Sequence, residues 1–189
     1  MRRWPSALAG AGLLGVFIGV ERRLRQSDAA RSLDAGEEDR GTTRAVAASF
    51  GSALLTGPLL ARWHRGRLRA ATGWMGIAVM AGGLTLRVAS ARALGAHYTR
   101  TLRTEPEQSV VTEGPYRYVR HPGYAGVLLM WLGFGLALTS VPAIVATTAP
   151  NLLAYLGRIE AEDSMLSEAL GDPYRAYRQR TRRLVPGLY

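Results

Sequence analysis

The chain has 189 residues, 48% of them hydrophobic, and a formal net charge of +10, a length that suits a single domain. It contains no cysteine, which excludes disulfides, cysteine-ligated zinc and a thiol nucleophile. All 24 basic residues are arginine, as is typical of a GC-rich bacterial genome, and they alternate with long apolar runs. Charge that flanks membrane segments therefore explains them better than binding to nucleic acid.

Five apolar segments approach the roughly 17–25 residues that a helix needs to cross a bilayer. In chain order they are 4–20, 45–61, 73–86 with an extension to 93, 123–139 and 141–156. The first is interpreted as a retained helix rather than a signal peptide. It is followed by a charged run, and a small-residue cleavage site is missing there. We expect an all-α integral membrane helical bundle of about five transmembrane helices, with a C-terminal cytoplasmic helical segment.

The connections predict an orientation, because cytoplasmic loops of membrane proteins carry an excess of basic residues. With five spans and a cytoplasmic C-terminus, segments 21–44, 87–122 and 157–189 hold eighteen arginines, against six on the outer side. Arg87 then lies near the inner end of its helix, where its side chain is expected to extend to the interface. We predict a protein of the bacterial inner membrane whose active site faces the cytoplasm.

The most informative stretch is GPYRYVRHPGYAG, residues 114–126. His121 precedes Pro122, so position 121 disfavours helix and Pro122 suits the first turn of the helix that follows. Free N–H groups and the positive end of the helix dipole favour an anionic ligand group there. Tyr124 lies in the first turn, and Gly126 leaves room for a ligand close to the backbone. An ordinary loop-to-helix entry with interfacial tyrosines explains the same pattern.

Other residues of this stretch have two interpretations as well. Tyr116 and Tyr118 suit either a site or the aromatic belt at a membrane interface. Arg117 and Arg120 suit lipid phosphates, but Arg120 adjoins His121 and is favoured for a role in a site.

A second polar stretch, RIEAED at residues 158–163, follows the last apolar segment. A tight connection at 140–142 turns the chain back, so Arg158 is expected at the membrane face where His121 lies. Arg158 and Glu162 are four apart and share one side of a helix, and Glu160 and Asp163 add two carboxylates. A surface salt bridge is the alternative.

Two further features complete the chain. Asn151 is polar within an apolar span and is expected to face the bundle interior, for function or for a helix–helix hydrogen bond. After Gly171, the tyrosines and arginines of the tail are interpreted as an amphipathic anchor on an anionic membrane surface: Tyr174, Tyr177, Arg175, Arg178 and Arg182. The histidines match no metal-ligand spacing, so no metal site is predicted.

Taken together, these motifs resemble the isoprenylcysteine carboxyl methyltransferase family, which is itself similar to the phospholipid N-methyltransferases. The resemblance covers about residues 94–187. It rests on a combination: the string Arg-His-Pro-x-Tyr-x-Gly, a helical hairpin, paired acids and a tyrosine repeat. Residues 1–93 carry no motif and are interpreted as transmembrane scaffold, and residues 94–189 as the methyltransferase core.

The resemblance implies an S-adenosylmethionine-dependent methyltransferase with a cytoplasmic cofactor pocket covered by the C-terminal segment. By matching position, it implies catalytic roles for Arg120, Arg158 and Glu162. It implies cofactor-binding roles for a larger set: Tyr116, His121, Pro122, Tyr124, Gly126, Glu162 and Asp163. Where the family commonly has two consecutive glutamates, this chain has Glu162-Asp163, and the shorter Asp163 reaches less far.

The expected partners are a lipophilic small-molecule or lipid acceptor and the surrounding membrane lipids, with no nucleic acid. O-methylation of a carboxylate is favoured, because a carboxylate is already ionised near neutral pH. An amine acceptor needs a base, for which His121 and Glu162 are the candidates. The alternatives are N- or S-methylation, a reductase-like protein and a non-catalytic membrane protein on the same scaffold.

Overall fold

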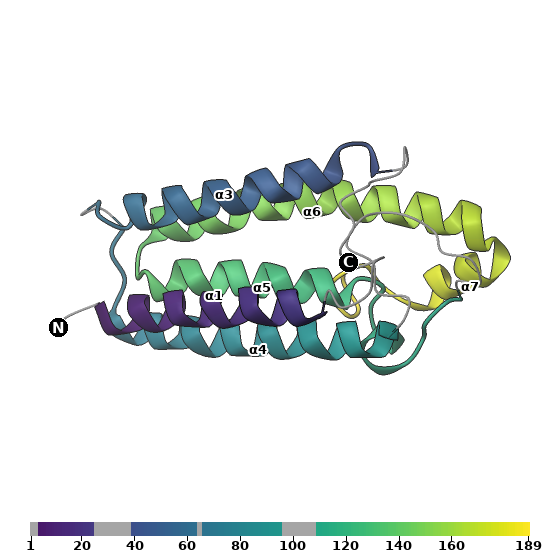
Figure 1. The fold of residues 1–189 in the computed structure, drawn as a ribbon, viewed down its shortest axis with the longest axis horizontal. Coiled ribbons are helices and arrows are strands. Elements are labelled where there is room, and N and C mark those ends of the chain that lie inside the picture. The colour runs from purple at the N-terminus through teal and green to yellow at the C-terminus, as the bar shows by residue number, and fades with distance from the viewer. Residues whose placement is uncertain (1–3, 25–38, 64–65, 96–108) are drawn as a thin grey trace.

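The computed structural model describes residues 4–24, 39–63, 66–95 and 109–189, and these are predominantly helical (Figure 1). The elements are α1 (Trp4–Leu24), α3 (Thr42–Leu60), α4 (Ala70–Leu94), the 3₁₀ helix η3 (Gly114–Arg117), α5 (Pro122–Ala137), α6 (Val141–Leu170) and α7 (Asp172–Arg180). Extended pairing within these ranges is confined to two isolated bridges, Arg67 with Ser140 and Val119 with Arg182. The all-α prediction is confirmed for this part of the chain.

Each of the five apolar segments falls in one of the long helices. By length and hydropathy, α4 alone among the helices of the described ranges qualifies to cross a membrane, and α5 is apolar but shorter. The count of five transmembrane helices therefore stays a prediction.

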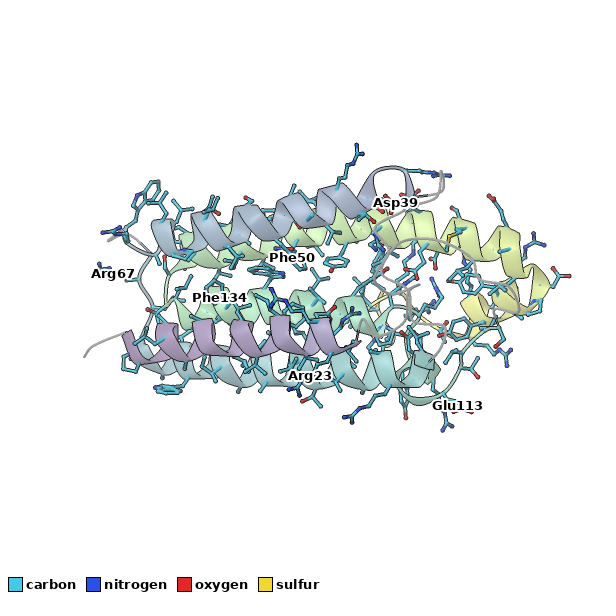
Figure 2. The ribbon with its side chains drawn as sticks, in the orientation of Figure 1. Arg23, Asp39, Phe50, Arg67, Glu113 and Phe134 are labelled. Carbon is cyan, nitrogen blue, oxygen red and sulfur yellow. The ribbon has the colours of Figure 1, made fainter. Side chains whose placement is uncertain are left out.

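The long helices form two packed groups. Helix α3 lies along α6, whereas α1 lies along α4 and α5, and contacts between α5 and α6 join the groups (Figure 1). Phe50 of α3 packs edge-on against Trp131 of α5, with ring centroids 5.1 Å apart, and Trp131 also contacts Phe134. Figure 2 shows Phe50 and Phe134 between the groups, where the apolar core lies.

Glycines bring the backbones of α4 and α5 into contact. A Cβ atom on Gly133 would lie 2.6 Å from the carbonyl oxygen of Gly76, and one on Gly126 would lie 2.7 Å from that of Gly83. Small residues permit such close helix packing. The room beside Gly126 is therefore occupied by α4, and we attribute this glycine to helix packing in place of the ligand contact that the sequence suggested.

The hairpin predicted between the last two apolar segments is present. Helix α5 ends at Ala137, Thr139 adopts a left-handed conformation with φ of 53°, and Ser140 caps α6 by accepting a bond from the Ala143 N–H. The C-terminal half of α6 consequently returns to the end of the bundle where α5 begins (Figure 1).

Two polar residues inside the bundle are paired. Asn151 is fully buried, accepts a hydrogen bond from Ser49 at 2.9 Å and donates one to the Thr147 carbonyl at 2.8 Å, which confirms that it faces the interior. Arg87 is also paired, and its side chain is 14% exposed. Its Nε lies 2.7 Å from Glu21 Oε1, because α1 places an acid within reach, and pairing stabilises a charge inside a bundle.

Candidate active site

His121 occupies the junction between the 109–120 segment and α5. It is the N-cap residue, Pro122 follows at the first helical position, and the His121 carbonyl accepts bonds from the N–H groups of Tyr124 and Ala125. The helix entry predicted from the His-Pro pair is thus confirmed. The His121 side chain is 3% exposed, so its polar atoms require partners within the protein.

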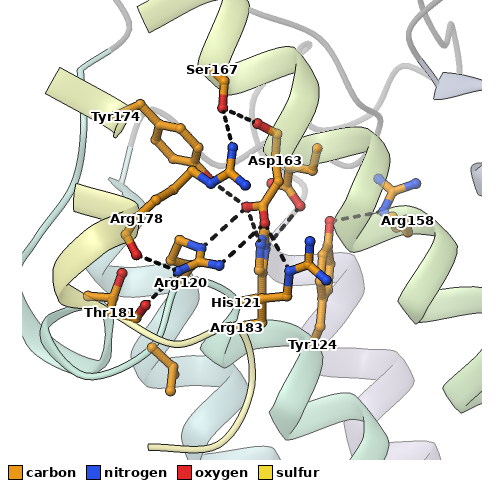
Figure 3. Close-up of polar contacts among 12 residues, drawn as sticks. Arg120, His121, Tyr124, Arg158, Asp163, Ser167, Tyr174, Arg178, Thr181 and Arg183 are labelled. Atoms are coloured by element: carbon orange, nitrogen blue, oxygen red, sulfur yellow. Dashed lines mark hydrogen bonds and ion pairs between the residues drawn. The ribbon is translucent and has the colours of Figure 1, made fainter. Parts of the chain in front are cut away.

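Two consecutive acids of α6 supply those partners. His121 Nε2 lies 3.0 Å from Asp163 Oδ1, and Nδ1 lies 3.3 Å from Glu162 Oε2. We call His121, Glu162 and Asp163 the acid–histidine cluster, and Figure 3 shows the contact between His121 and Asp163. The α5–α6 hairpin therefore brings together side chains about 40 positions apart in sequence, as the predicted site requires.

Asp163 is the more heavily bonded of the two acids. Besides His121, it accepts a hydrogen bond from the Tyr174 hydroxyl at 2.7 Å and one from Arg183 Nε at 3.2 Å. Arg120 Nε lies 3.4 Å away. With its side chain 2% exposed, Asp163 has its oxygens surrounded by donors from the two residues before α5 and from residues 174 and 183 (Figure 3).

The charges of the cluster stabilise one another. Burial alone would raise the pKa of Asp163, but the hydrogen bonds from His121 and Tyr174 and the charges of His121 and Arg120 lower it well below its usual value. Burial alone would lower the pKa of His121, but hydrogen bonds and charges from Asp163 and Glu162 raise it. The pKa of Glu162 is lowered against its burial, chiefly by His121. Imidazolium and two carboxylates are therefore the favoured forms.

The C-terminal segment is docked onto the residues before α5. The Arg120 N–H donates to the Arg182 carbonyl at 2.7 Å, and the His121 N–H donates to the Arg183 carbonyl at 3.0 Å. The Arg120 guanidinium also donates to the Thr181 carbonyl at 2.6 Å. Arg120 thus joins the cluster to the tail, in agreement with its preference over Arg117, which is exposed.

The prediction that the tyrosines of α7 anchor the chain to a membrane surface is wrong. Tyr174 and Tyr177 are 3% and 6% exposed, and the Tyr177 hydroxyl donates to the Tyr116 carbonyl at 2.7 Å. Their spacing of three places both on one face of the helix, and that face packs against the protein. Arg183 was missed altogether, because nothing in the sequence distinguishes it from the neighbouring arginines.

Arg158 connects the cluster to α3. Its Nε donates to the Tyr124 hydroxyl at 2.9 Å, and its Nη1 lies 3.0 Å from Thr43 Oγ1 and 3.4 Å from Asp39 Oδ1. The Tyr124 ring is parallel to that of His121, with centroids 5.6 Å apart. Tyr124 therefore links the acid–histidine cluster to Arg158.

A cavity of about 320 Å³ lies beside Tyr124 and Arg158 and is also lined by α1 and α3. Of the remaining predicted residues, Tyr116 and Pro122 are buried, and Glu160 is exposed. Groups of three or more acids, histidines or cysteines suited to hold a metal ion do not occur in the described ranges.

Comparison with known proteins identifies the family. The sequence profile of the phospholipid methyltransferases matches residues 71–173, more than half of the chain. The chain belongs to the phospholipid methyltransferase family. The match begins within the segment that sequence analysis interpreted as scaffold, and it includes the whole acid–histidine cluster.

Curated relatives share this region. The chain is 28% identical over 115 residues to a probable protein-S-isoprenylcysteine O-methyltransferase of Oryza sativa subsp. indica, covering 60% of each chain. It is 25% identical over 118 residues to the protein-S-isoprenylcysteine O-methyltransferase of Dictyostelium discoideum, covering 61% of this chain and 50% of that one. The chain thus spans 50–60% of the length of these relatives. The resemblance noted in the sequence is confirmed.

The fold has a solved counterpart. The structure of a eukaryotic intramembrane Ras methyltransferase, isoprenylcysteine carboxyl methyltransferase, aligns with a TM-score of 0.58 and 23% identity. The alignment covers 77% of this chain and 52% of that one. The helical arrangement in Figure 1 therefore shares the fold of that protein.

Proposed function

We propose that the protein is an integral membrane methyltransferase that uses S-adenosylmethionine and methylates a carboxylate on a lipophilic acceptor. The observation that carries this proposal is the acid–histidine cluster, which lies in the family region at one end of the helix bundle. S-adenosylmethionine, when bound, supplies the methyl group on a positively charged sulfur.

The residues of the cluster suit a positively charged cofactor. Glu162 Oε2 is buried and contacts His121 Nδ1 at 3.3 Å, outside good hydrogen-bond geometry, while the Glu162 side chain as a whole is 24% exposed. A buried acceptor of this kind favours a donor from a ligand. Glu162 would hold the ammonium group or offset the sulfonium charge, and His121 would orient Glu162 through the 3.3 Å contact.

The arginines suit the carboxylates of the reaction. A guanidinium binds a carboxylate through paired hydrogen bonds. Arg120 is committed to the tail and to Asp163, so its role is to position the cluster. Arg158 lines the cavity beside Tyr124, which places it on the side where an acceptor would lie. Methyl transfer depends mainly on such positioning and on the exclusion of water.

The state of His121 favours a carboxylate acceptor over an amine. An amine must lose a proton to become a nucleophile. Both ring nitrogens of His121 face carboxylates and its pKa is raised, which favours the imidazolium form, and an imidazolium has no lone pair with which to take a proton from an amine. The lowered pKa of Glu162 makes that group a weak base too. A carboxylate acceptor needs neither.

We propose that the cluster faces the cytoplasm at a bacterial inner membrane, because the segments that carry it hold the larger share of the arginines. We propose that the cofactor enters from that side, that the acceptor enters from the lipid, and that the C-terminal segment covers the cofactor site. Membrane lipids surround the bundle, and no nucleic acid takes part.

Calorimetric titration of the detergent-solubilised protein with S-adenosylmethionine tests the proposal. We expect binding that weakens at least tenfold in Glu162→Gln. The control variant Glu160→Gln removes the same charge from an exposed position of the same helix and should bind normally. Equal affinity in all three proteins would refute the site.

Incubation of membranes with a labelled methyl donor tests the reaction. A carboxyl methyl ester releases its label as methanol under mild base. A base-stable label would show N- or S-methylation instead, and the absence of any labelled product together with intact cofactor binding would refute the choice of acceptor class.

A further inference from the structure

The cavity beside Tyr124 lies between the two packed groups of helices. Helix α1 packs on α4 and α5, whereas α3 packs on α6, and all five contribute to the walls of the cavity. Its volume of about 320 Å³ is at the small end of the range of about 300–1,000 Å³ for small-molecule sites. Two of its helices, α1 and α3, lie outside the family region 71–173.

One part of the cavity wall is positively charged. Three arginines line it, Arg22, Arg87 and Arg158, with Glu21 as the single lining acid. Arg87 and Glu21 form a two-point contact of 2.7 and 3.2 Å, and their side chains are 14% and 11% exposed. Arg158 also contacts Asp39 at 3.4 Å, so the two ion pairs leave one positive side chain in excess, Arg22, and this partly open wall favours an anionic group.

The other part of the wall is apolar. Phe17 comes from α1, Val46, Ala47 and Phe50 come from α3, and Val127 comes from α5. Apolar side chains on several helices provide a surface for a hydrocarbon chain, since burial of that chain is favourable at about 25 cal/mol per Å². Charge and apolar surface in one cavity match a ligand that is itself amphipathic.

The cavity adjoins the acid–histidine cluster through shared residues. Tyr124 and Arg158 line the cavity, the Tyr124 ring stacks on His121 at 5.6 Å, and its hydroxyl accepts a bond from Arg158 at 2.9 Å. A ligand whose anionic group lay against Arg158 would have that group next to the cluster.

We propose that this cavity is the acceptor site, and that the acceptor is a single-chain monocarboxylic acid. The carboxylate lies at Arg87 and Arg158, and the hydrocarbon chain lies between α1 and α3. The small volume favours one chain over the two chains of a phospholipid. The side chains of α1 and α3 thus select the acceptor. This inference deepens the proposed methyltransferase function and rests on it for the fate of the acid, although the binding site is tested independently.

The test measures binding of radiolabelled hexadecanoate to the full-length protein in phosphatidylcholine nanodiscs, by scintillation proximity and without a methyl donor. Both Ala47 and Ala48 are exposed, but only Ala47 lines the cavity. Ala47→Phe therefore adds a large side chain to the apolar wall, whereas Ala48→Phe adds the same side chain to the next residue of α3, outside the cavity. We expect at least a tenfold loss of affinity in Ala47→Phe and less than a twofold change in Ala48→Phe. Matching unfolding midpoints confirm that both variants fold.

Competition by unlabelled ligands tests the chemical class. Hexadecanoate should compete at least tenfold better than hexadecan-1-ol, which lacks the negative charge, and better than dioleoyl phosphatidylethanolamine, which has two chains. Equal competition by the alcohol overturns the role of the arginines, and stronger competition by the phospholipid overturns the single-chain assignment. Unchanged binding in Ala47→Phe overturns the site.

The failure of this inference differs from the failure of the proposed function. Hexadecanoate binding without S-adenosylmethionine binding would leave the cavity as an acid-binding site and refute the methyltransferase. S-adenosylmethionine binding without hexadecanoate binding would refute the acceptor site alone.

Discussion

Replacement of Asp163 by Asn tests whether this carboxylate holds the C-terminal segment to the helix bundle. Its side chain is 2% exposed, and it faces His121 at 3.0 Å and Arg120 at 3.4 Å, which are themselves only 3% and 8% exposed. Removal of one partner of a buried ion pair costs about 3–5 kcal/mol. The amide retains the size of the side chain and still accepts from Tyr174, so we expect the lower end of that range.

Hydrogen–deuterium exchange is the appropriate assay, because the segment is expected to open locally before the bundle unfolds. The N–H groups of Arg120 and His121 donate to the carbonyls of Arg182 and Arg183 and therefore report docking directly. A loss of about 3 kcal/mol corresponds to exchange about 100-fold faster at these groups and in α7. The amides in the middle of α4 should be unaffected.

Glu160→Gln is the matched control, since it removes the same charge from an exposed position three residues earlier in α6. We expect a change within about 0.5 kcal/mol for such a surface substitution. If Asp163→Asn accelerates exchange less than tenfold, or no more than the control does, the proposed role of Asp163 in holding the tail is wrong.

Two further predictions concern stability. Because the pKa of folded His121 is raised above 6.5, the stabilisation that its charge provides is complete below pH 6.5 and is lost as pH rises through the raised value. The unfolding midpoint should therefore fall over that pH range in the wild type and fall much less in His121→Gln. Parallel plots of midpoint against pH for the two proteins would refute the pairing. Gly133→Ala should lower the free energy of unfolding by about 1–3 kcal/mol through overpacking, because its Cβ would lie 2.6 Å from the Gly76 carbonyl oxygen. The control Gly82→Ala places its Cβ where nothing lies within 4 Å and should be neutral or stabilising. Equal effects of the two variants on the unfolding midpoint would contradict the contact between α4 and α5.

Local sequence signals predicted much of the fold around the site. The His121-Pro122 pair located the start of α5, since proline restricts the preceding residue and suits the first helical position. The apolar runs located all five long helices, and the short connection before Pro142 predicted the hairpin. These signals determined that residues 121 and 158–163 meet at one end of the bundle.

These local signals could not predict contacts between segments that are distant in the sequence. No residue near Glu21 in the sequence indicates that it contacts Arg87, 66 positions later. Because α1 and α4 are far apart in the sequence, local patterns do not predict this ion pair. Gly126 was assigned to a ligand because a glycine indicates that some group lies close to the backbone but does not identify that group. In the structure the group is the backbone of α4. Tyr174 and Tyr177 have the pattern of an interfacial helix, and the acceptor groups for their hydroxyls lie elsewhere in the sequence.

The two adjacent acids of the cluster have separable roles, and this separation explains why a folded protein can keep a carboxylate for a ligand. Asp163 accepts bonds from His121, Tyr174 and Arg183, so its bonding capacity is used within the protein. Glu162, one position earlier in the same helix turn, has an ion-pair contact from His121 at 3.3 Å to its buried Oε2 and remains partly exposed. If Asp163 orders His121 and the tail, Glu162 is oriented before any ligand arrives, and less entropy is lost when one binds. Asp163→Asn should then weaken cofactor binding only through loss of order, whereas Glu162→Gln should weaken it with the tail still protected from exchange.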